Sequence, residues 1–179
     1  MPELRFAAIA PALALLMAGA GSAQSQTADF RWLAGLAGAC WSGVFPDGKT
    51  RHTQCYRMQF DRFLRGSASL SIEQNGVSRL QFEGDSVFAA DPANASIVYY
   101  IWGSDGSHRQ LSAHFSGDEI LFPVPSRKAP HEIAYRSVWR RVSDNAFEVR
   151  RERPAAGGWS VELTVMYRRD TTGPRVPSQ

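Results

Sequence analysis

The chain has 179 residues, enough for one domain of ordinary size, and it is 44% hydrophobic and 21% charged. Two cysteines are too few for a disulfide-dense toxin or a cysteine-rich metal domain, and the composition excludes a polytopic membrane protein. The formal net charge of +3 is too small to imply a nucleic-acid partner.

Residues 1–23 have the pattern of a secretory signal peptide. Arg5 supplies a positive charge, residues 7–17 form an apolar stretch of 11 residues, and small residues lead to a cleavage site after Ala23. The apolar stretch is too short to span a bilayer, which takes roughly 20 residues. We therefore expect an exported protein, periplasmic or extracellular, with no transmembrane span.

Export changes the interpretation of the two cysteines, because a lone pair in an oxidising compartment most simply forms a disulfide. Cys40 and Cys55 flank a turn sequence, Pro-Asp-Gly-Lys, at positions 46–49. A hairpin with a four-residue loop, closed by residues 45 and 50, places the cysteines directly opposite each other at a non-hydrogen-bonded pair. The spacing thus predicts a Cys40–Cys55 disulfide rather than a redox C-x-x-C motif.

After one predicted helix over residues 28–36, the rest of the chain alternates between polar and apolar residues. The predicted strands are 39–45, 50–60, 67–73, 78–90, 97–102, 109–115, 119–124, 133–142, 146–153 and 159–169. Residues 78–90 fit either one bent strand or two short ones. Tight turns separate the strands, and no helix between them is long enough for a parallel crossover.

This pattern predicts an all-β fold, a single antiparallel barrel of eight to ten strands with a short N-terminal helix. We expect a signal peptide over 1–23, a lead with the short helix over 24–37, the barrel domain over 38–170 and a disordered tail over 171–179. An outer-membrane barrel is the alternative, but it would need an apolar lipid-facing surface, whereas the expected outward faces are charged.

The alternation also predicts which side chains face the barrel interior. In the first hairpin, Trp41, His52 and Tyr56 share the interior face and the two cysteines lie on the polar outer face. In the last strand, the interior set is Trp159, Val161, Leu163, Val165, Tyr167 and Arg169. Arg141 and Arg151 are also expected to point inward near the barrel ends.

The segment Gly38-Ala39-Cys40-Trp41-Ser42-Gly43, after a short helix, resembles the first strand of the calycin barrels. That superfamily includes lipocalins, fatty-acid-binding proteins and nitrobindin-like domains, and the chain is also similar to uncharacterised exported bacterial barrel domains. The resemblance covers roughly residues 30–169, although the spacing Gly-x-x-Trp departs from the lipocalin Gly-x-Trp. It implies that Trp41 closes one end of the barrel, packed by Arg169 from the last strand.

The sequence contains no recognisable catalytic or metal-binding motif. His52, His108, His114 and His131 lack metal-ligand spacing, and His108 and His114 lie too far apart on one strand face to share a metal. A haem site would need a late axial histidine, and His131 lies in a proline-rich loop that matches poorly. We expect no cofactor, no metal, no nucleic acid and no assignable catalytic residue.

The leading interpretation is an exported barrel that binds a small, largely apolar molecule, with or without a negative charge. The expected ligand-binding residues are the wall residues His52, Tyr56, Trp102, Tyr135 and Trp139, with Arg141 or Arg151 as the charge partner. Residues 127–169 carry ten Lys or Arg against five Asp or Glu, which indicates either an anionic partner or a solvated basic face. Two alternatives remain, an envelope structural or interaction protein with a filled core and, less favoured, a barrel enzyme of the isomerase or cyclase type.

Overall fold

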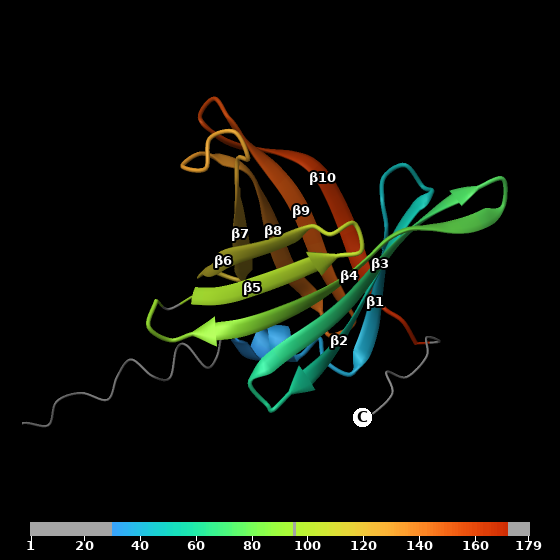
Figure 1. The fold of residues 1–179 in the computed structure, drawn as a ribbon, viewed down its shortest axis with the longest axis horizontal. Coiled ribbons are helices and arrows are strands. Elements are labelled where there is room, and N and C mark those ends of the chain that lie inside the picture. The colour runs from blue at the N-terminus through green and yellow to red at the C-terminus, as the bar shows by residue number, and fades with distance from the viewer. Residues whose placement is uncertain (1–29, 95, 172–179) are drawn as a thin grey trace, which may run out of the picture.

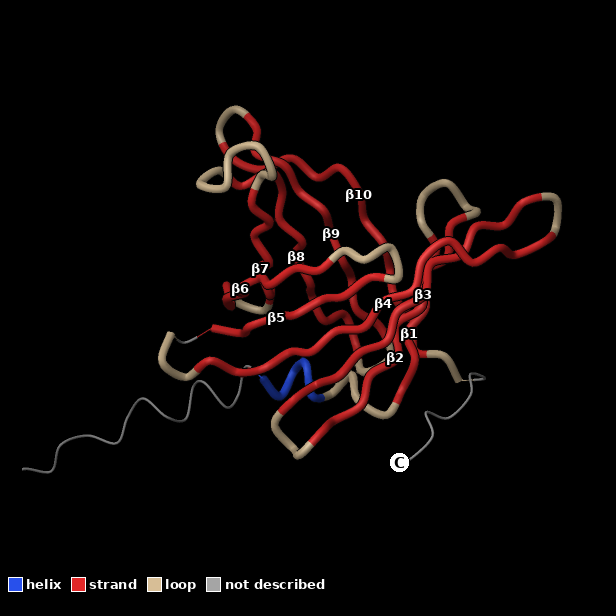
Figure 2. Tube along the Cα trace, viewed as in Figure 1, coloured by secondary structure: helices blue, strands red, loops and turns tan. Residues whose placement is uncertain are grey.

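The computed structural model describes residues 30–94 and 96–171, which form an antiparallel barrel closed by ten strands (Figure 1). The strands are β1 (Ala39–Val44), β2 (Thr50–Gln59), β3 (Phe63–Gln74), β4 (Val77–Asp91), β5 (Ser96–Gly103), β6 (His108–Ser116), β7 (Glu119–Pro125), β8 (Ile133–Ser143), β9 (Ala146–Ala155) and β10 (Gly158–Arg169). Each strand pairs with the next along the chain, and β10 pairs with β1 to close the barrel. A helical turn over residues 30–34 lies under one end (Figure 2).

The all-β barrel expected from the sequence is confirmed, with residues 78–90 inside one long strand, β4. The helix is shorter than predicted and ends at residue 34, one residue before Gly35. The predicted signal peptide (1–23) and residues 172–179 of the predicted tail lie outside the described residues. Within the described part of the chain, no helix is long and apolar enough to cross a membrane.

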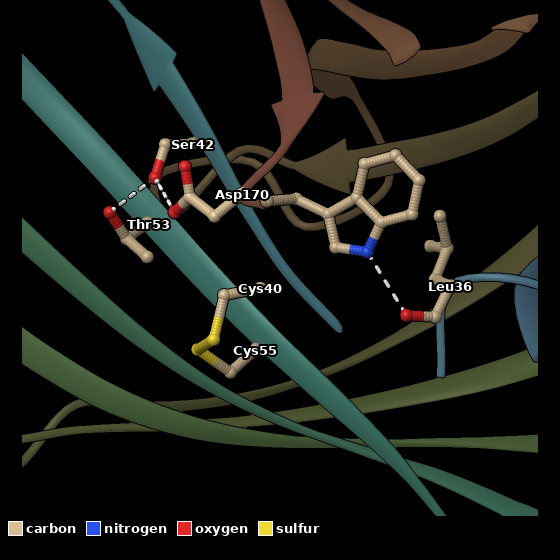
Figure 3. Close-up of a disulfide and its surroundings, with 7 residues drawn as sticks. Leu36, Cys40, Ser42, Thr53, Cys55 and Asp170 are labelled. Atoms are coloured by element: carbon tan, nitrogen blue, oxygen red, sulfur yellow. Dashed lines mark hydrogen bonds between the residues drawn. A yellow bond between two sulfur atoms is a disulfide. The ribbon is translucent and has the colours of Figure 1, made fainter. Parts of the chain in front are cut away.

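The first hairpin has the register that the cysteine spacing predicts. Cys40 lies opposite Cys55 and forms a disulfide with it, with the two Cα atoms 3.9 Å apart (Figure 3). The loop closes where the amide of Phe45 donates to the carbonyl of Thr50. Beside the disulfide, the Ser42 hydroxyl contacts the Thr53 hydroxyl and donates to Asp170 (Figure 3). These contacts tie the end of the barrel domain to its first strand.

Trp41 closes the end of the barrel above the helical turn. Its side chain is 2% exposed, and its indole N–H donates to the carbonyl of Leu36 over 3.0 Å. Arg169 lies opposite Trp41 in the β1–β10 register, with Cζ 5.7 Å from the Trp41 ring centroid. Leu33, from the helical turn, is fully buried in the same core. The closed ten-stranded barrel is consistent with a calycin-like shape.

Aromatic rings fill the half of the barrel next to Trp41. The Phe88 and Tyr99 rings stack with centroids 4.0 Å apart, and the Phe147 and Tyr167 rings stack at 4.8 Å. The full cluster consists of Trp41, Tyr56, Phe88, Tyr99, Phe122, Trp139, Phe147 and Tyr167. Because these rings interdigitate at van der Waals distance, this half of the interior is a packed core.

The outer face of β7, β8 and β9 carries a network of charged side chains over the fully buried Val138. Arg150 contacts the carboxylates of Glu119, Glu148 and Glu152. Burial works against the charge of Arg150, but these three hydrogen bonds outweigh it and hold its pKa above the usual range. Arg136, Arg140 and Arg150 of the basic C-terminal segment are thus paired with carboxylates on this outer face.

The barrel wall opens between β6 and β7. These strands pair only where His114–Ser116 meet Glu119–Leu121, and beyond this short ladder they separate. Figure 1 shows β7 rising with β8, β9 and β10 while β5 and β6 run across the barrel. Two prolines, Pro123 and Pro125, lack the amide hydrogen needed to extend a ladder along the separated part of β7. The two strands therefore diverge beyond this short ladder.

A β-bulge in β10 reverses the predicted inward or outward direction of some of its side chains. Val161 pairs with Glu152 and Leu163 pairs with Arg151, so Glu162 is the extra residue. Strict alternation, which predicts Trp159 and Val161 inside, is therefore wrong for both. They share the outer face with Glu152, at 40% and 52% exposure. Trp159 lies there against the guanidinium of Arg136, whose Cζ is 4.2 Å from the ring centroid.

Candidate functional site

The open half of the barrel contains a cluster of arginine side chains around one tyrosine. Tyr135 projects inward from β8, and the guanidinium of Arg109, from β6, donates to its hydroxyl over 3.4 Å. Arg151, from β9, lies on the face of the same ring with Cζ 4.3 Å from the centroid. Tyr135 therefore holds two arginines from opposite sides of the gap between β6 and β7. We call Arg109, Tyr135 and Arg151 the mouth cluster.

The mouth cluster carries more positive charge than its acidic neighbour can balance. Glu162 forms an ion pair with Arg151 and another with Arg153. Arg109 forms no ion pair with any of the described residues. Arg109, Arg151 and Arg153 thus share the single carboxylate of Glu162, which makes this end of the interior locally basic. The sequence alone does not identify Arg109, because it is a lone arginine on an apolar strand face. It also does not identify Glu162, because the direction of that side chain depends on the bulge.

Deeper in the barrel, polar side chains form a hydrogen-bonded chain. The Tyr56 hydroxyl donates to Oε1 of Gln54, and the Gln54 amide nitrogen lies 3.4 Å from Nδ1 of His52. The Tyr167 hydroxyl lies 2.7 Å from the same Nδ1. This interior chain joins Tyr56, Gln54, Tyr167 and His52 across β2 and β10.

Burial sets the protonation of the interior chain. It lowers the pKa of His52 to about 4, so the imidazole is neutral at neutral pH. Burial also raises the pKa of Tyr56 and, against a hydrogen bond from Gln54, the pKa of Tyr167. Nearby Tyr99 has a pKa raised by burial to about 12. The chain therefore carries no net charge, and it can exchange hydrogen bonds but not salt bridges with a ligand.

Four of the expected wall residues lie in the interior. Tyr56 and Trp139 are buried in the packed core, at 1% and 5% exposure, while His52 and Tyr135 lie on the open side of that core. The expectation that Trp102 lines the interior is wrong. It pairs with Asp85 and His108 on the outer face and is 47% exposed. Alternation along β5 gives the interior face to Tyr99 and Ile101 instead.

The two arginines expected as charge partners lie at opposite ends of the barrel. Arg141 pairs with Phe147 in the β8–β9 register, whereas Arg151 lies four residues further along β9. Arg141 borders a cavity of about 10 Å³ at the closed end and pairs with Asp144. A cavity of that volume holds no more than a water molecule. Of the two arginines, only Arg151 belongs to the mouth cluster.

In the described residues, no three His, Cys, Asp or Glu side chains gather closely enough to hold a metal ion. His108 and His114 are exposed on β6, and His131 is exposed in the loop after β7. The polar groups that do converge in the interior are arginines, tyrosines, an amide and a neutral imidazole. Such a donor set suits an anionic or hydrogen-bonding organic ligand better than a cation.

Comparison with known proteins adds no family to this description. No protein family model matches the chain, and no curated protein matches it at a significant level. Function must therefore be argued from the barrel and its side chains alone.

Proposed function

We propose that this chain is an exported barrel that binds a small amphipathic anion, with the acid group at the mouth cluster and the apolar part inside. The observation that carries the proposal is the unpaired Arg109, held by Tyr135 beside Arg151. An arginine turned toward a barrel interior without a carboxylate partner is costly unless a ligand or water completes its hydrogen bonds. The Cys40–Cys55 disulfide supports export, because such bonds persist in oxidising compartments.

The apolar side chains beneath the mouth cluster fit the other end of such a molecule. Val149 lies between Phe147 and Arg151 on β9, while Leu163 pairs with Arg151 and Ile101 pairs with Arg109, and all three are partly buried hydrophobic residues packed against the core. Each buried methylene group of a ligand contributes roughly 0.8 kcal/mol against these walls. Because the aromatic cluster fills the closed half, the site takes a short chain and not a long one folded back on itself.

The packed half also supports the second candidate function, an envelope interaction protein whose core is filled. In that case the mouth arginines would contact only water. A ligand-binding measurement distinguishes the two candidate functions directly, because a filled barrel binds no amphipathic molecule.

The test is isothermal titration of the mature protein with decanoate and with decan-1-ol, which share an apolar chain and differ in charge. We expect decanoate to bind more tightly than decanol. Arg109→Gln should weaken decanoate binding about tenfold, since a hydrogen bond to a charged group contributes about 1.5 kcal/mol, and leave decanol unchanged. Arg79→Gln, on the exposed part of β4 near its hairpin turn, is the matched control and should alter neither.

If neither compound binds below its aggregation limit, the binding function is wrong and the interaction protein is favoured. If both bind equally and Arg109→Gln affects neither, the barrel binds apolar molecules without an anionic head.

A further inference from the structure

The interior chain has a direction, because an amide oxygen can only accept a hydrogen bond. Tyr56 donates to the oxygen of Gln54, which turns the Gln54 nitrogen toward the other members of the chain. That nitrogen lies 3.4 Å from Nδ1 of His52 and directs an N–H toward it. The Tyr167 hydroxyl lies 2.7 Å from the same Nδ1 and donates its proton to it. Two donors thus converge on Nδ1.

This direction determines the tautomer of His52. A nitrogen that accepts hydrogen bonds carries no proton, so the single proton of the neutral ring lies on Nε2. No described residue forms a hydrogen bond with Nε2, and this atom is not among the polar atoms sealed from solvent inside the barrel. The partly buried His52 side chain therefore has an N–H donor with no partner among the described residues.

The backbone of β1 makes this arrangement possible. Gly43 lies between His52 and Tyr167 in the strand register. A Cβ atom at position 43 would lie 2.5 Å from a methyl carbon of Val165 and 3.3 Å from the Tyr167 ring. Glycine at this position lets Tyr167 pack closely enough for its hydroxyl to meet the imidazole.

We infer that the ligand carries a second polar group, a hydrogen-bond acceptor such as a carbonyl oxygen, that binds the Nε2 proton of His52. This inference rests on the proposed function, since the same molecule places its acid at the mouth cluster. Tyr167 pairs with Phe147 and Arg151 lies four residues further along β9, so the two contact points are roughly 13 Å apart along the strands. The ligand class is an oxo-substituted short-chain acid, with the oxo group well away from the acid.

The tautomer is measured first, without any ligand. In ¹⁵N NMR of the mature protein, we expect His52 to have a protonated Nε2 and a bare Nδ1. Tyr167→Phe should weaken this preference, because it removes one of the two donors to Nδ1, whereas Tyr99→Phe removes a hydroxyl from the same core and should leave it unchanged. A proton on Nδ1 in the wild-type protein would mean that the Gln54 amide has the reverse orientation, and the inference would be overturned.

Binding is measured next with decanoate and with decanoates that bear one oxo group at successive chain positions. We expect one or two oxo positions to bind at least about fivefold more tightly than decanoate. His52→Phe should remove that preference, whereas His108→Phe, on exposed β6, should keep it. If decanoate binds but no oxo position is preferred, the inference fails and the proposed function stands. If no acid binds, both fail together.

Discussion

Nε of Arg151 lies 3.2 Å from Oε2 of Glu162, although strict alternation along β10 would place these two residues on opposite faces of the barrel. The bulge between Val161 and Leu163 turns Glu162 inward and brings it to the arginine. The pair is partly exposed, with side-chain exposures of 41% and 34%. The pair therefore contributes little to stability, and under the proposed function it would lower the positive charge of the mouth cluster.

Replacing the carboxylate tests this role. We expect Glu162→Gln to change the free energy of unfolding by less than about 1 kcal/mol, because an exposed ion pair contributes no more than that. Decanoate should bind up to about fivefold more tightly, since the arginines lose their internal competitor. Urea denaturation and titration calorimetry measure the two effects. Glu73→Gln, on the exposed end of β3, should change neither, and a weaker affinity in Glu162→Gln would show that the carboxylate helps to bind the ligand.

The disulfide should make a large contribution to stability. It closes a loop with a sequence separation of 15 residues, for which the loss of chain entropy in the unfolded state gives about 3 kcal/mol. We expect reduction, or a double Cys40→Ser and Cys55→Ser variant, to lower the urea midpoint accordingly. The reduced wild type and the double variant should agree. A midpoint unaffected by reduction would mean that the hairpin is held by its ladder alone.

The aromatic cluster should dominate the stability of the closed half. Phe88 is fully buried and stacks on Tyr99, so Phe88→Ala should cost about 3–5 kcal/mol by loss of burial and creation of a cavity. Phe60→Ala removes the same side chain from a turn where it is 76% exposed, and should change stability by less than about 0.5 kcal/mol. Similar losses in the two variants, measured by urea denaturation, would contradict a packed core around Phe88.

The strands, their order and the first-hairpin register could be predicted from the sequence because each depends on neighbours along the chain. Alternation, turn residues and the cysteine spacing are local signals, and an antiparallel meander converts local order directly into sheet order. Trp102 shows the limit of such reasoning. Both faces of β5 carry aromatic residues, so apolar content alone could not tell the inner ring of Tyr99 from the outer ring of Trp102.

The mouth cluster depends on features that no local pattern reports. Arg109 can reach Tyr135 because β6 separates from β7, and this contact joins residues 26 positions apart. The bulge at Glu162 has no marker such as glycine or proline in its own sequence. The basic excess of the C-terminal segment pointed toward anions, but Arg136, Arg140 and Arg150 pair with carboxylates on the outer face. The arginine that is left unpaired in the mouth lies outside that segment.

The acid sensitivity of folding should report on His52. Its folded pKa of about 4 lies below the ordinary histidine pKa of 6.5, so below pH 6.5 the unfolded chain takes up this proton first. The stabilisation is complete above pH 6.5 and is lost as the pH falls toward 4, for a total of about 3 kcal/mol. His52→Gln should remove this component when unfolding free energies are compared from pH 7 to pH 4. His108→Gln, on exposed β6, is the matched control and should keep the wild-type profile. If the profile of His52→Gln also matched the wild type, the pKa of His52 would be the same in the folded and unfolded chain, and burial would not keep the ring neutral.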